Sequence, residues 1–409
     1  MSKQRNIRIN IPILTRVEGE GALQLQIKNG AIQDLQLRIY EPPRLFEKML
    51  EGREPNEVID MVARICGICP VAYQLTAVQA LESLFEVSVT PWVRAMRRVF
   101  YCGEWLQSHA LHIHMLAAPD FLGYNSIIEM AADHPAIVRR GLRLQSLGND
   151  LIALFGARSV HPVGVQVGGF YHAPGPQAVA SLMARLQTAK QDATELVRWT
   201  TSLPFPDNQQ DFIAVCLRHP TEYPMNEGRI VSNAGLDIDA HNYLDHIHEL
   251  QVPHSTALHA LLQDKPYLVG PLARINLNLD HLPPELDELL KAGGITFPSL
   301  NMFHSIVARA AEIWLAIDEA LHLLQDYSNP ASAAVSWQAV AGTGITATEA
   351  PRGLLWHQYV LDDTGRIQNA RIIPPTSQNQ ARIEEDLRNS LQLFGLEQDD
   401  DALRLHGET

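Results

Sequence analysis

The sequence has few cysteines and no long apolar run, and both shortages narrow the class of protein. Four cysteines in 409 residues are too few for a disulfide framework, so we expect reduced thiols. No stretch approaches the roughly 20 apolar residues of a membrane-spanning helix. The N-terminal segment MSKQRNIRINIPIL holds neither a signal-peptide core nor a twin-arginine signal. These features predict a cytoplasmic protein that does not insert into a membrane.

Basic charge is also scarce. The chain has 32 Lys and Arg against 46 Asp and Glu, a formal net charge of −14. Such a surface repels phosphate groups, so we do not expect nucleic acid as a partner. Hydrophobic residues make up 46% and charged residues 19%, a globular balance that excludes a disordered or fibrous chain.

The chain also lacks internal repeats, low-complexity tracts and clear linkers. We therefore expect one domain over residues 1–409 rather than a string of separate units. Residues 6–40 alternate apolar and polar side chains around an Asn29-Gly30 turn, which predicts a β-hairpin or small sheet within an N-terminal β element, residues 1–45.

Residues 46–330 are predicted to form a mostly helical body. Asn56 is a candidate N-cap, Gly67 should break the helix, and Pro70 should start the next one. A long helical stretch follows over residues 91–117.

The remaining segments complete an α+β, mainly helical fold. Residues 135–156 and 175–200 have helical patterns, whereas 205–300 predict an insertion of short strands. Residues 301–327 carry apolar side chains at helical spacing and predict the middle of a long helical bundle. Residues 331–409 should contribute short strands, turns and a helix, so that the β elements are small and peripheral.

The segment Arg-Ile-Cys-Gly-Ile-Cys-Pro, residues 64–70, is the strongest local signal for chemistry. Cys66 and Cys69 can converge on one soft metal, and a helix start at Pro70 would favour the thiolate form of Cys69. A structural zinc half-site, a thioredoxin-like dithiol and two plain buried cysteines fit the same spacing. The other cysteines are single and distant, so two of the usual four thiolate ligands are missing.

Three further segments are ambiguous by themselves. His109, His112 and His114 could bind zinc, but hydrogen-bonded histidines that line an interior are the simpler interpretation. Thr-Arg-Val-Glu-Gly-Glu at residues 15–20 reads as a solvated strand end. Glu-Ala-Pro-Arg-Gly at residues 349–353 predicts a rigid loop.

Taken in order, these segments resemble the large subunit of nickel–iron hydrogenases. The likeness covers nearly the whole chain and rests on six motifs in family order: TRVEGEG, PPRLFEKMLEGREPNEVIDMVARICGICP, HALHIHMLAAPDF, SVHPVGVQVGGF, EAPRGLLWHQYVLDDTGRI and PPTSQN. Each motif alone is modest, and their common order is specific.

The resemblance implies reversible, heterolytic cleavage of H2 at a nickel bound by four cysteine thiolates. Two of these thiolates bridge to an iron that carries carbon monoxide and cyanide. By position, Cys66 resembles the terminal nickel ligand and Cys69 a bridging one. Glu18 resembles the carboxylate that relays protons from the nickel thiolate.

The same resemblance assigns five more residues. Arg352 corresponds to the arginine above the open metal position, and Asp120 to the acid that pairs with it. Pro351 and Thr376 correspond to residues around the iron cyanides. Glu47 corresponds to a ligand of a buried magnesium or similar ion. The metal site is expected deep, at the face that meets the small subunit.

Electrons are expected to leave through iron–sulfur clusters of a small subunit. Tyr73, where many members have histidine, and the GICPVAYQ and RVEGEG segments resemble the cytoplasmic, NAD(P)-linked branch. That branch implies further partner subunits with flavin and iron–sulfur clusters that reduce NAD(P).

One departure from the family pattern leaves alternatives open. The family's C-terminal Asp-Pro-Cys-x-x-Cys-x-x-His is absent, and the sequence stops at HGET. We expect a missing tail, and an immature apo form is the other possibility. A non-catalytic relative, similar to the quinone-site subunit of respiratory complex I, and a zinc-stabilised interaction protein are the remaining alternatives.

Overall fold

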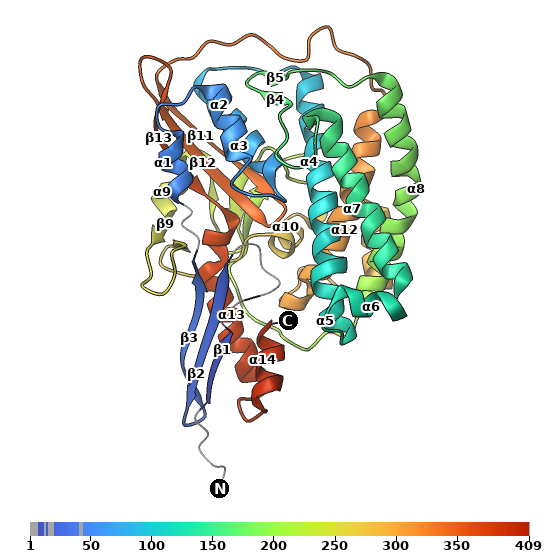
Figure 1. Cartoon of the computed structure of the whole chain (residues 1–409), viewed down its shortest axis with the longest axis vertical. Coiled ribbons are helices and arrows are strands. Elements are labelled where there is room, and N and C mark those ends of the chain that lie inside the picture. Colours follow the sequence, from blue (N-terminus) through green and yellow to red (C-terminus); the bar gives the residue numbers. More distant parts are fainter. Residues whose placement is uncertain (1–6, 12–13, 15–19, 41–43, 409) are drawn as a thin grey trace.

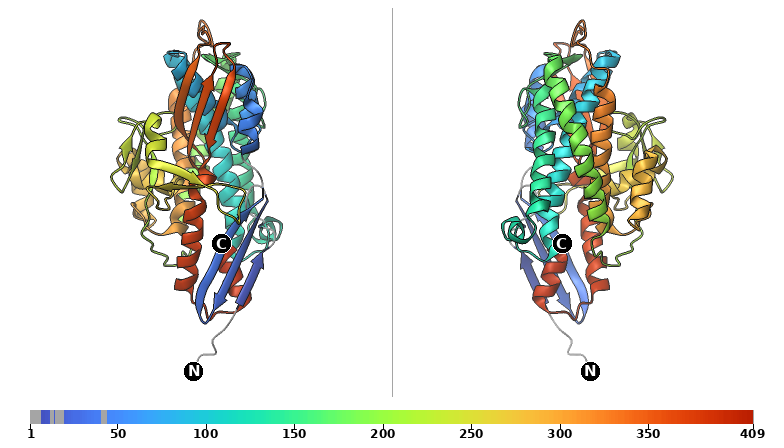
Figure 2. Two further views of the ribbon diagram at one scale, coloured as in Figure 1. Left: turned by 90° about the vertical axis from the view of Figure 1, so that its left-hand side faces the viewer. Right: turned by 90° about the vertical axis from the view of Figure 1, so that its right-hand side faces the viewer.

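The computed structural model describes residues 7–11, 14, 20–40 and 44–408. A bundle of long helices forms one side of the molecule, and small antiparallel sheets lie against its other side and its lower end (Figures 1 and 2). The predicted α+β, mainly helical architecture is therefore confirmed. None of the helices in the described ranges combines the length and the apolar composition needed to cross a membrane.

Four long helices and a π-helical turn make the bundle. These elements are α4 (Pro91–Leu111), the turn His112–Ala117 that continues it, α7 (Pro135–Gly156), α8 (Pro176–Thr201) and α12 (Ser305–Leu324). Helix α12 packs against both α4 and α8, and most of its side chains are buried. The predicted central position of this helix is thus confirmed.

Shorter helices surround the bundle. They are α1 (Arg44–Leu50), α2 (Pro55–Val62), α3 (Pro70–Leu84), α5 (Ala118–Leu122), α6 (Ile127–Asp133), α9 (Tyr243–His246), α10 (Pro271–Leu277), α11 (Pro284–Ala292), α13 (Pro375–Phe394) and α14 (Asp400–Glu408). The predicted helix start at Pro70 is confirmed, whereas the preceding helix ends at Val62, earlier than the break expected at Gly67.

The predicted N-cap of α2 is wrong. Glu54, not Asn56, takes this position, and Pro55 is the first helical residue. Glu54 and Glu57 form a reciprocal capping box, with the Glu54 backbone N–H donating to Glu57 Oε2 at 2.9 Å. Proline has no N–H to satisfy and already has a helical φ, so the helix starts one residue earlier than Asn56 would allow.

The two larger three-stranded sheets are meanders. The first contains β1 (Ile7–Ile11), β2 (Gly21–Lys28) and β3 (Ala31–Ile39), and the second contains β11 (Gly342–Ala350), β12 (Gly353–Leu361) and β13 (Ile367–Ile373). Asn29 and Gly30 both have positive φ, 53° and 74°, as the predicted two-residue turn requires. The strands of the second sheet have 9, 9 and 7 residues, longer than the short strands expected there.

Three smaller sheets complete the chain. They consist of β4 (Val165–Gln166) with β5 (Gly169–Phe170), of β6 (Val215–Arg218) with β7 (Arg229–Ser232) and β8 (Asp237–Ile238), and of β9 (Ile247–Leu250) with β10 (His259–Leu262). The second large sheet packs against α3. This packing brings the β11–β12 turn toward the cysteine pair.

Candidate functional site

The two cysteines of the Cys-x-x-Cys segment meet at the start of α3. Both are buried, and their sulfur atoms are joined in a disulfide across a Cα–Cα distance of 5.3 Å. The expectation of reduced thiols is therefore wrong for this pair, because the turn brings the two residues within disulfide range. The Cys69 N–H donates to Cys66 Sγ at 3.0 Å. Two electrons would break the S–S bond and leave two adjacent thiolates.

A buried carboxylate fixes the helix that carries Cys69. Glu104 of α4 is fully buried and accepts from the backbone N–H groups of Val71 at 2.5 Å and Ala72 at 3.1 Å. These first-turn N–H groups have no partner within their own helix, so Glu104 anchors the start of α3 to the bundle. No local sequence pattern marks Glu104, because its partners lie 33 and 32 residues away along the chain.

Arg352 reaches the same place from the other side. It lies in the turn between β11 and β12, and its Nη1 is 3.9 Å from Cys69 Sγ. Gly353 has a φ of +137°, and a Cβ atom there would lie 2.7 Å from the Gly270 nitrogen. Glycine is therefore required for this close approach. The structure thus brings together two residues that are 283 positions apart.

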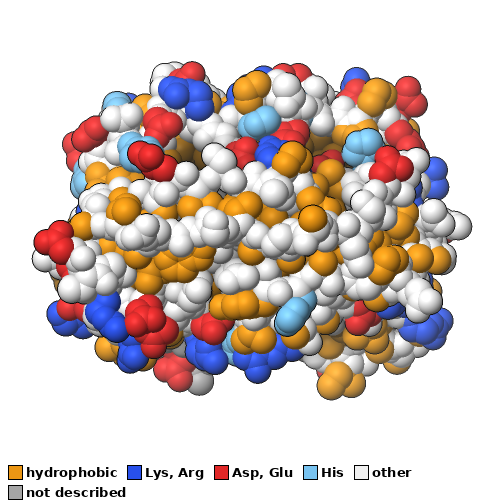
Figure 3. All heavy atoms as spheres, turned by 90° about the horizontal axis from the view of Figure 1, so that it is seen from above, with side chains coloured by type: hydrophobic (Ala, Val, Ile, Leu, Met, Phe, Trp, Pro, Cys, Tyr) orange, Lys and Arg blue, Asp and Glu red, His pale blue; other side chains and the backbone are white. Residues whose placement is uncertain are grey.

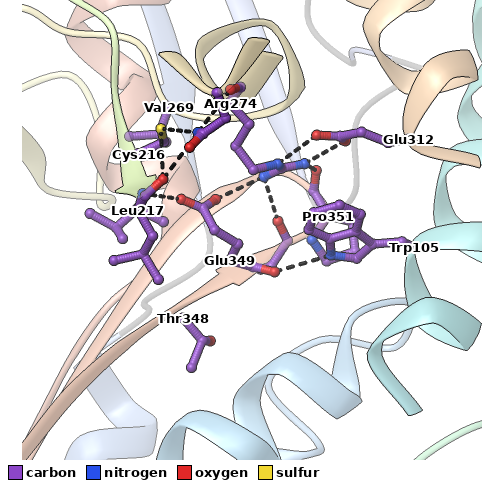
Figure 4. Close-up of polar contacts among 12 residues, drawn as sticks. Trp105, Cys216, Leu217, Val269, Arg274, Glu312, Thr348, Glu349 and Pro351 are labelled. Atoms are coloured by element: carbon purple, nitrogen blue, oxygen red, sulfur yellow. Dashed lines mark hydrogen bonds and ion pairs between the residues drawn. The ribbon is translucent and has the colours of Figure 1, made fainter. Parts of the chain in front are cut away.

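The backbone before Arg352 is held by the buried guanidinium of Arg274, from α10 (Figure 4). Arg274 donates to the carbonyl oxygens of Ala350 and Pro351, each at 2.9 Å. It also donates to Glu349 at 2.9 Å and twice to Glu312 at 2.7 Å. All five N–H donors of the side chain are used, so the turn has little freedom to move.

The charges in this network are strongly perturbed. Burial raises the pKa of Glu349 to about 7, although Arg274 opposes the shift. Burial also acts to raise the pKa of Glu312, but the charge and hydrogen bonds of Arg274, with a contribution from His109, lower it to about 2. Glu312 is therefore the ionised partner of Arg274, and Glu349 changes protonation near neutral pH.

The three clustered histidines do not converge on one point. His109 Nε2 pairs with Glu312 at 2.9 Å, and His114 Nδ1 contacts the Ala110 carbonyl at 3.0 Å. Among the described residues, the one group with metal-binding geometry lies elsewhere. The interpretation as interior, hydrogen-bonded histidines therefore fits His109 and His114, and the zinc alternative at this segment has no support.

The other residues named from the resemblance are scattered around the site. Asp120 lies in α5 and is partly buried, and Pro351 is buried next to Arg352. Thr376 lies in the first turn of α13 with its side chain exposed. Glu18 lies outside the described residues.

Glu47 is held at the edge of the second large sheet. Its Oε1 accepts from the Ile372 N–H at 2.7 Å, and its carboxylate pairs with Arg44 at 2.9 Å. Burial raises its pKa, and these two partners only partly offset the effect. A divalent cation would offset the remaining desolvation of this carboxylate, which is compatible with the expected metal-binding role.

The surroundings of the cysteine pair fit an anionic metal–thiolate group. His112 Nδ1 is buried and has no hydrogen-bond partner among the described residues. Burial, together with the charges of Arg309 and Arg352, holds the pKa of His112 well below its usual value. Burial and nearby arginines also lower the pKa of Arg309 to about 10. The Arg352 guanidinium, 3.9 Å from Cys69 Sγ, would stabilise a thiolate there and a metal bound to it.

The two remaining cysteines do not complete the site. Cys102 is buried within α4, and Cys216 of β6 accepts a hydrogen bond from Asn278 at 3.3 Å. Burial raises the pKa of both thiols, which disfavours the thiolate form needed for metal binding. Cys66 and Cys69 are therefore the two cysteines of this chain that suit a metal ligand.

Comparisons with known proteins agree with this geometry. Residues 44–139 match the family model described as nickel-dependent hydrogenase. Sulfhydrogenase 1 subunit alpha of Pyrococcus furiosus is 30% identical over 400 residues, covering 94% of this chain and 91% of the relative. The periplasmic NiFeSe hydrogenase large subunit of Desulfomicrobium baculatum is 27% identical over 91% of this chain and 86% of the relative. The crystal structure of an NAD+-reducing NiFe-hydrogenase in the H2-reduced state superposes with a TM-score of 0.87 at 25% identity. The match covers 99% of this chain and 97% of that structure's chain.

Proposed function

Because this chain belongs to the nickel-dependent hydrogenase family as a large, catalytic subunit, we propose that Cys66 and Cys69 hold its nickel–iron centre. The observation that carries the proposal is the contact between Arg352 Nη1 and the sulfur of the buried Cys69, at 3.9 Å. When bound, the centre supplies a Lewis-acidic metal at which H2 is polarised and split. Carbon monoxide and cyanide on the iron, with Pro351 and Thr376 around them, are part of the proposal.

The proposed role of Arg352 is electrostatic. Its guanidinium is a planar, cationic hydrogen-bond donor and lies 3.9 Å from Cys69 Sγ. It therefore stabilises the thiolate and places an N–H donor beside the metal position. Arg274 acts through the backbone, because it fixes the two carbonyl groups that precede Arg352. We assign Asp120 as the acid that pairs with Arg352.

Proton transfer is assigned to Glu18. A carboxylate can accept the proton that a metal-bound thiolate releases and pass it to water. Glu18→Gln should leave the nickel and iron content unchanged and block hydrogen–deuterium exchange. Normal exchange in that variant would refute the relay.

The small subunit is proposed to dock on the upper end of the molecule. Seen from above, apolar side chains gather across this face (Figure 3). The α7–α8 loop exposes Val160, Val163 and Tyr171, and the α12–β11 loop exposes Val340; both loops cross this end (Figure 1). An apolar surface of this kind is typical of a permanent subunit interface. Iron–sulfur clusters in that subunit would take the electrons.

The electron acceptor and the compartment are further parts of the proposal. The likeness to an NAD+-reducing enzyme supports NAD(P) as acceptor, through partner subunits with flavin and iron–sulfur clusters. A cytoplasmic location agrees with that acceptor. We also propose that Glu47 binds magnesium or a similar ion.

An infrared spectrum of the purified complex, combined with nickel and iron analysis, tests the proposal. We expect bands of iron-bound carbon monoxide and cyanide. Cys69→Ser should lose the bands and the nickel, whereas the control Cys102→Ala should keep both. A wild-type complex without bands and without nickel would be an apo form, and the residue roles would be withdrawn.

Arg352→Lys separates metal binding from catalysis. The bands should remain, because a positive charge is retained, while H2 oxidation should fall on the order of 100-fold through loss of the fixed, planar donor. The control Arg229→Lys, at an exposed arginine of β7, should have normal activity. Unchanged turnover in Arg352→Lys would exclude a direct role for the guanidinium.

A further inference from the structure

A second group of metal-ligating side chains lies away from the cysteine pair, where the β9–β10 hairpin meets α13. One ring nitrogen each of His254 and His259 and one carboxylate oxygen of Glu384 all lie within 4.8 Å of one another. We propose that these three residues bind a divalent transition-metal ion, best suited to zinc. This ion would tie the hairpin to α13.

The three ligands come from separate parts of the chain that other contacts hold in place. His259 opens β10 opposite Leu250 of β9, His254 lies in the loop between these strands, and Glu384 lies within α13. The loop is fastened to β3, because the Thr256 N–H donates to the Ile39 carbonyl at 2.9 Å. The site is therefore built by the fold and does not depend on one flexible segment.

The surroundings of His259 are independent evidence that a metal ion binds here. The His259 side chain is 4% exposed, and its Nε2 is buried without a hydrogen-bond partner among the described residues. A buried polar atom without a hydrogen-bond partner is energetically costly, so its presence points to an unplaced ligand. The His259 ring also meets the His254 ring nearly perpendicularly, with centroids 5.8 Å apart. A metal ion would bind the buried His259 Nε2, for which the described part of the protein supplies no hydrogen-bond partner.

The donor set matches the chemistry of zinc. Two imidazoles and one carboxylate, with a water molecule, complete a tetrahedral site. Glu384 Oε1 also accepts from the Leu37 N–H at 2.8 Å. Such a backbone donor orients a ligating carboxylate.

Only small movements would form the site. His254 Nε2 now contacts Glu384 Oε1 at 2.8 Å. Zinc–ligand bonds of about 2.0–2.1 Å place tetrahedral ligand atoms roughly 3.3–3.4 Å apart. This pair would open by about half an ångström, and the His259 nitrogen would move inward.

The ion would have a structural role, distinct from that of Glu47. It would join the hairpin to the helix that begins next to Thr376, while β3 already binds Glu384 through the Leu37 N–H. Loss of the ion should therefore lower thermal stability and leave the nickel content unchanged.

The experiment uses the purified enzyme complex, first treated with a chelator and then titrated with zinc chloride. Glu384→Gln and His259→Gln are compared with the control His248→Gln, because His248 is a β9 histidine whose exposed ring pairs with Asp264. Wild type and control should bind one more zinc per chain than the two variants. Their zinc-edge X-ray absorption should show imidazole scattering. Loss of a ligand should weaken zinc binding more than about 100-fold.

Several outcomes would overturn the site. Equal zinc binding in wild type and Glu384→Gln, zinc without an imidazole signature, or no zinc bound at 100-fold molar excess would each do so. If His259→Gln fails to fold, Glu384→Gln and the visible spectrum of the cobalt-substituted wild type still decide the question. Nickel content and infrared bands are recorded in parallel, so a failure of this site is distinguishable from a failure of the cysteine site.

Discussion

At the scale of single residues, Arg274 links the buried carboxylates Glu312 and Glu349 to the β11–β12 turn that carries Arg352. Its guanidinium lies 4.4 Å from the centre of the Trp105 ring and is fully buried. Glu312 and Glu349 surround it, and each of its N–H groups has an acceptor. Such a network is stable only while it is complete, because each partner removes the desolvation penalty of another.

Replacement of Arg274 by methionine should therefore be strongly destabilising. Glu312 would keep its burial and lose its counter-charge, which costs about 3–5 kcal/mol. Urea unfolding followed by circular dichroism measures the change. The matched control Arg229→Met breaks an exposed pair with Asp237 and should cost at most about 1 kcal/mol. Equal effects of the two changes would show that the buried network stabilises the protein no more than an exposed ion pair does.

At the scale of elements, the bundle depends on the close approach of α4 and α7. Gly103 on α4 faces Gly148 on α7, and a Cβ atom on Gly148 would lie 2.5 Å from the Gln107 nitrogen and 2.6 Å from the Gly103 carbonyl oxygen. The two backbones therefore touch where α4 carries Glu104, the residue that caps α3. Packing at this crossing therefore helps to fix where the cysteine pair lies relative to the bundle.

Gly148→Ala should test this crossing. The added methyl group meets backbone atoms that cannot rotate away, so overpacking should destabilise the protein by about 1–3 kcal/mol. The control Gly407→Ala lies in α14, where a Cβ atom would have its nearest neighbour at 3.8 Å. That change should leave stability equal or slightly higher, because alanine favours a helix. Thermal unfolding compares the two, and a stable Gly148→Ala protein would contradict the close-contact argument.

At the scale of the whole molecule, buried neutral histidines make stability depend on pH. Burial lowers the pKa of His109 to about 4, and that of His114 and His357 to about 3. In the unfolded chain, the pKa of histidine is about 6.5. The unfolded state therefore binds more protons between these values, and stability falls as the pH drops below about 6.5. Glu349 acts in the opposite direction, because its raised pKa favours the folded state at lower pH.

His357→Gln should flatten this dependence. Each buried histidine contributes up to about 1.4 kcal/mol per pH unit between the two pKa values. The variant should thus lose less stability than the wild type between pH 6.5 and pH 4, as judged from the unfolding midpoint at each pH. The exposed His172→Gln serves as control and should follow the wild type. Parallel pH profiles for all three proteins would contradict the assignment of His357.

Local sequence signals predicted those features whose cause lies within a few residues. Asn29-Gly30 requires positive φ at both positions, Pro70 starts a helix without an N–H to satisfy, and residues 301–327 repeat apolar side chains at helical spacing. Such signals fail where two neighbours compete, as with Glu54 and Asn56 for the N-cap of α2. The order of the six motifs identified the family, since their common order leaves few other candidates.

The tertiary structure alone decided which distant side chains meet. Glu104 meets α3, and Arg274 meets the Ala350 and Pro351 carbonyls, across tens of residues without any sequence signal. The resemblance had placed Arg352 at the metal that Cys69 binds, and the structure supplies their contact. The ligand group of His254, His259 and Glu384 has no sequence signature, because its members lie on a loop, a strand and a helix. Backbone conformation is fixed by local sterics and hydrogen bonding, and the sequence determines it directly. Charge pairing and metal-ligand geometry depend on how packed elements cross, and this is known only after the chain has folded.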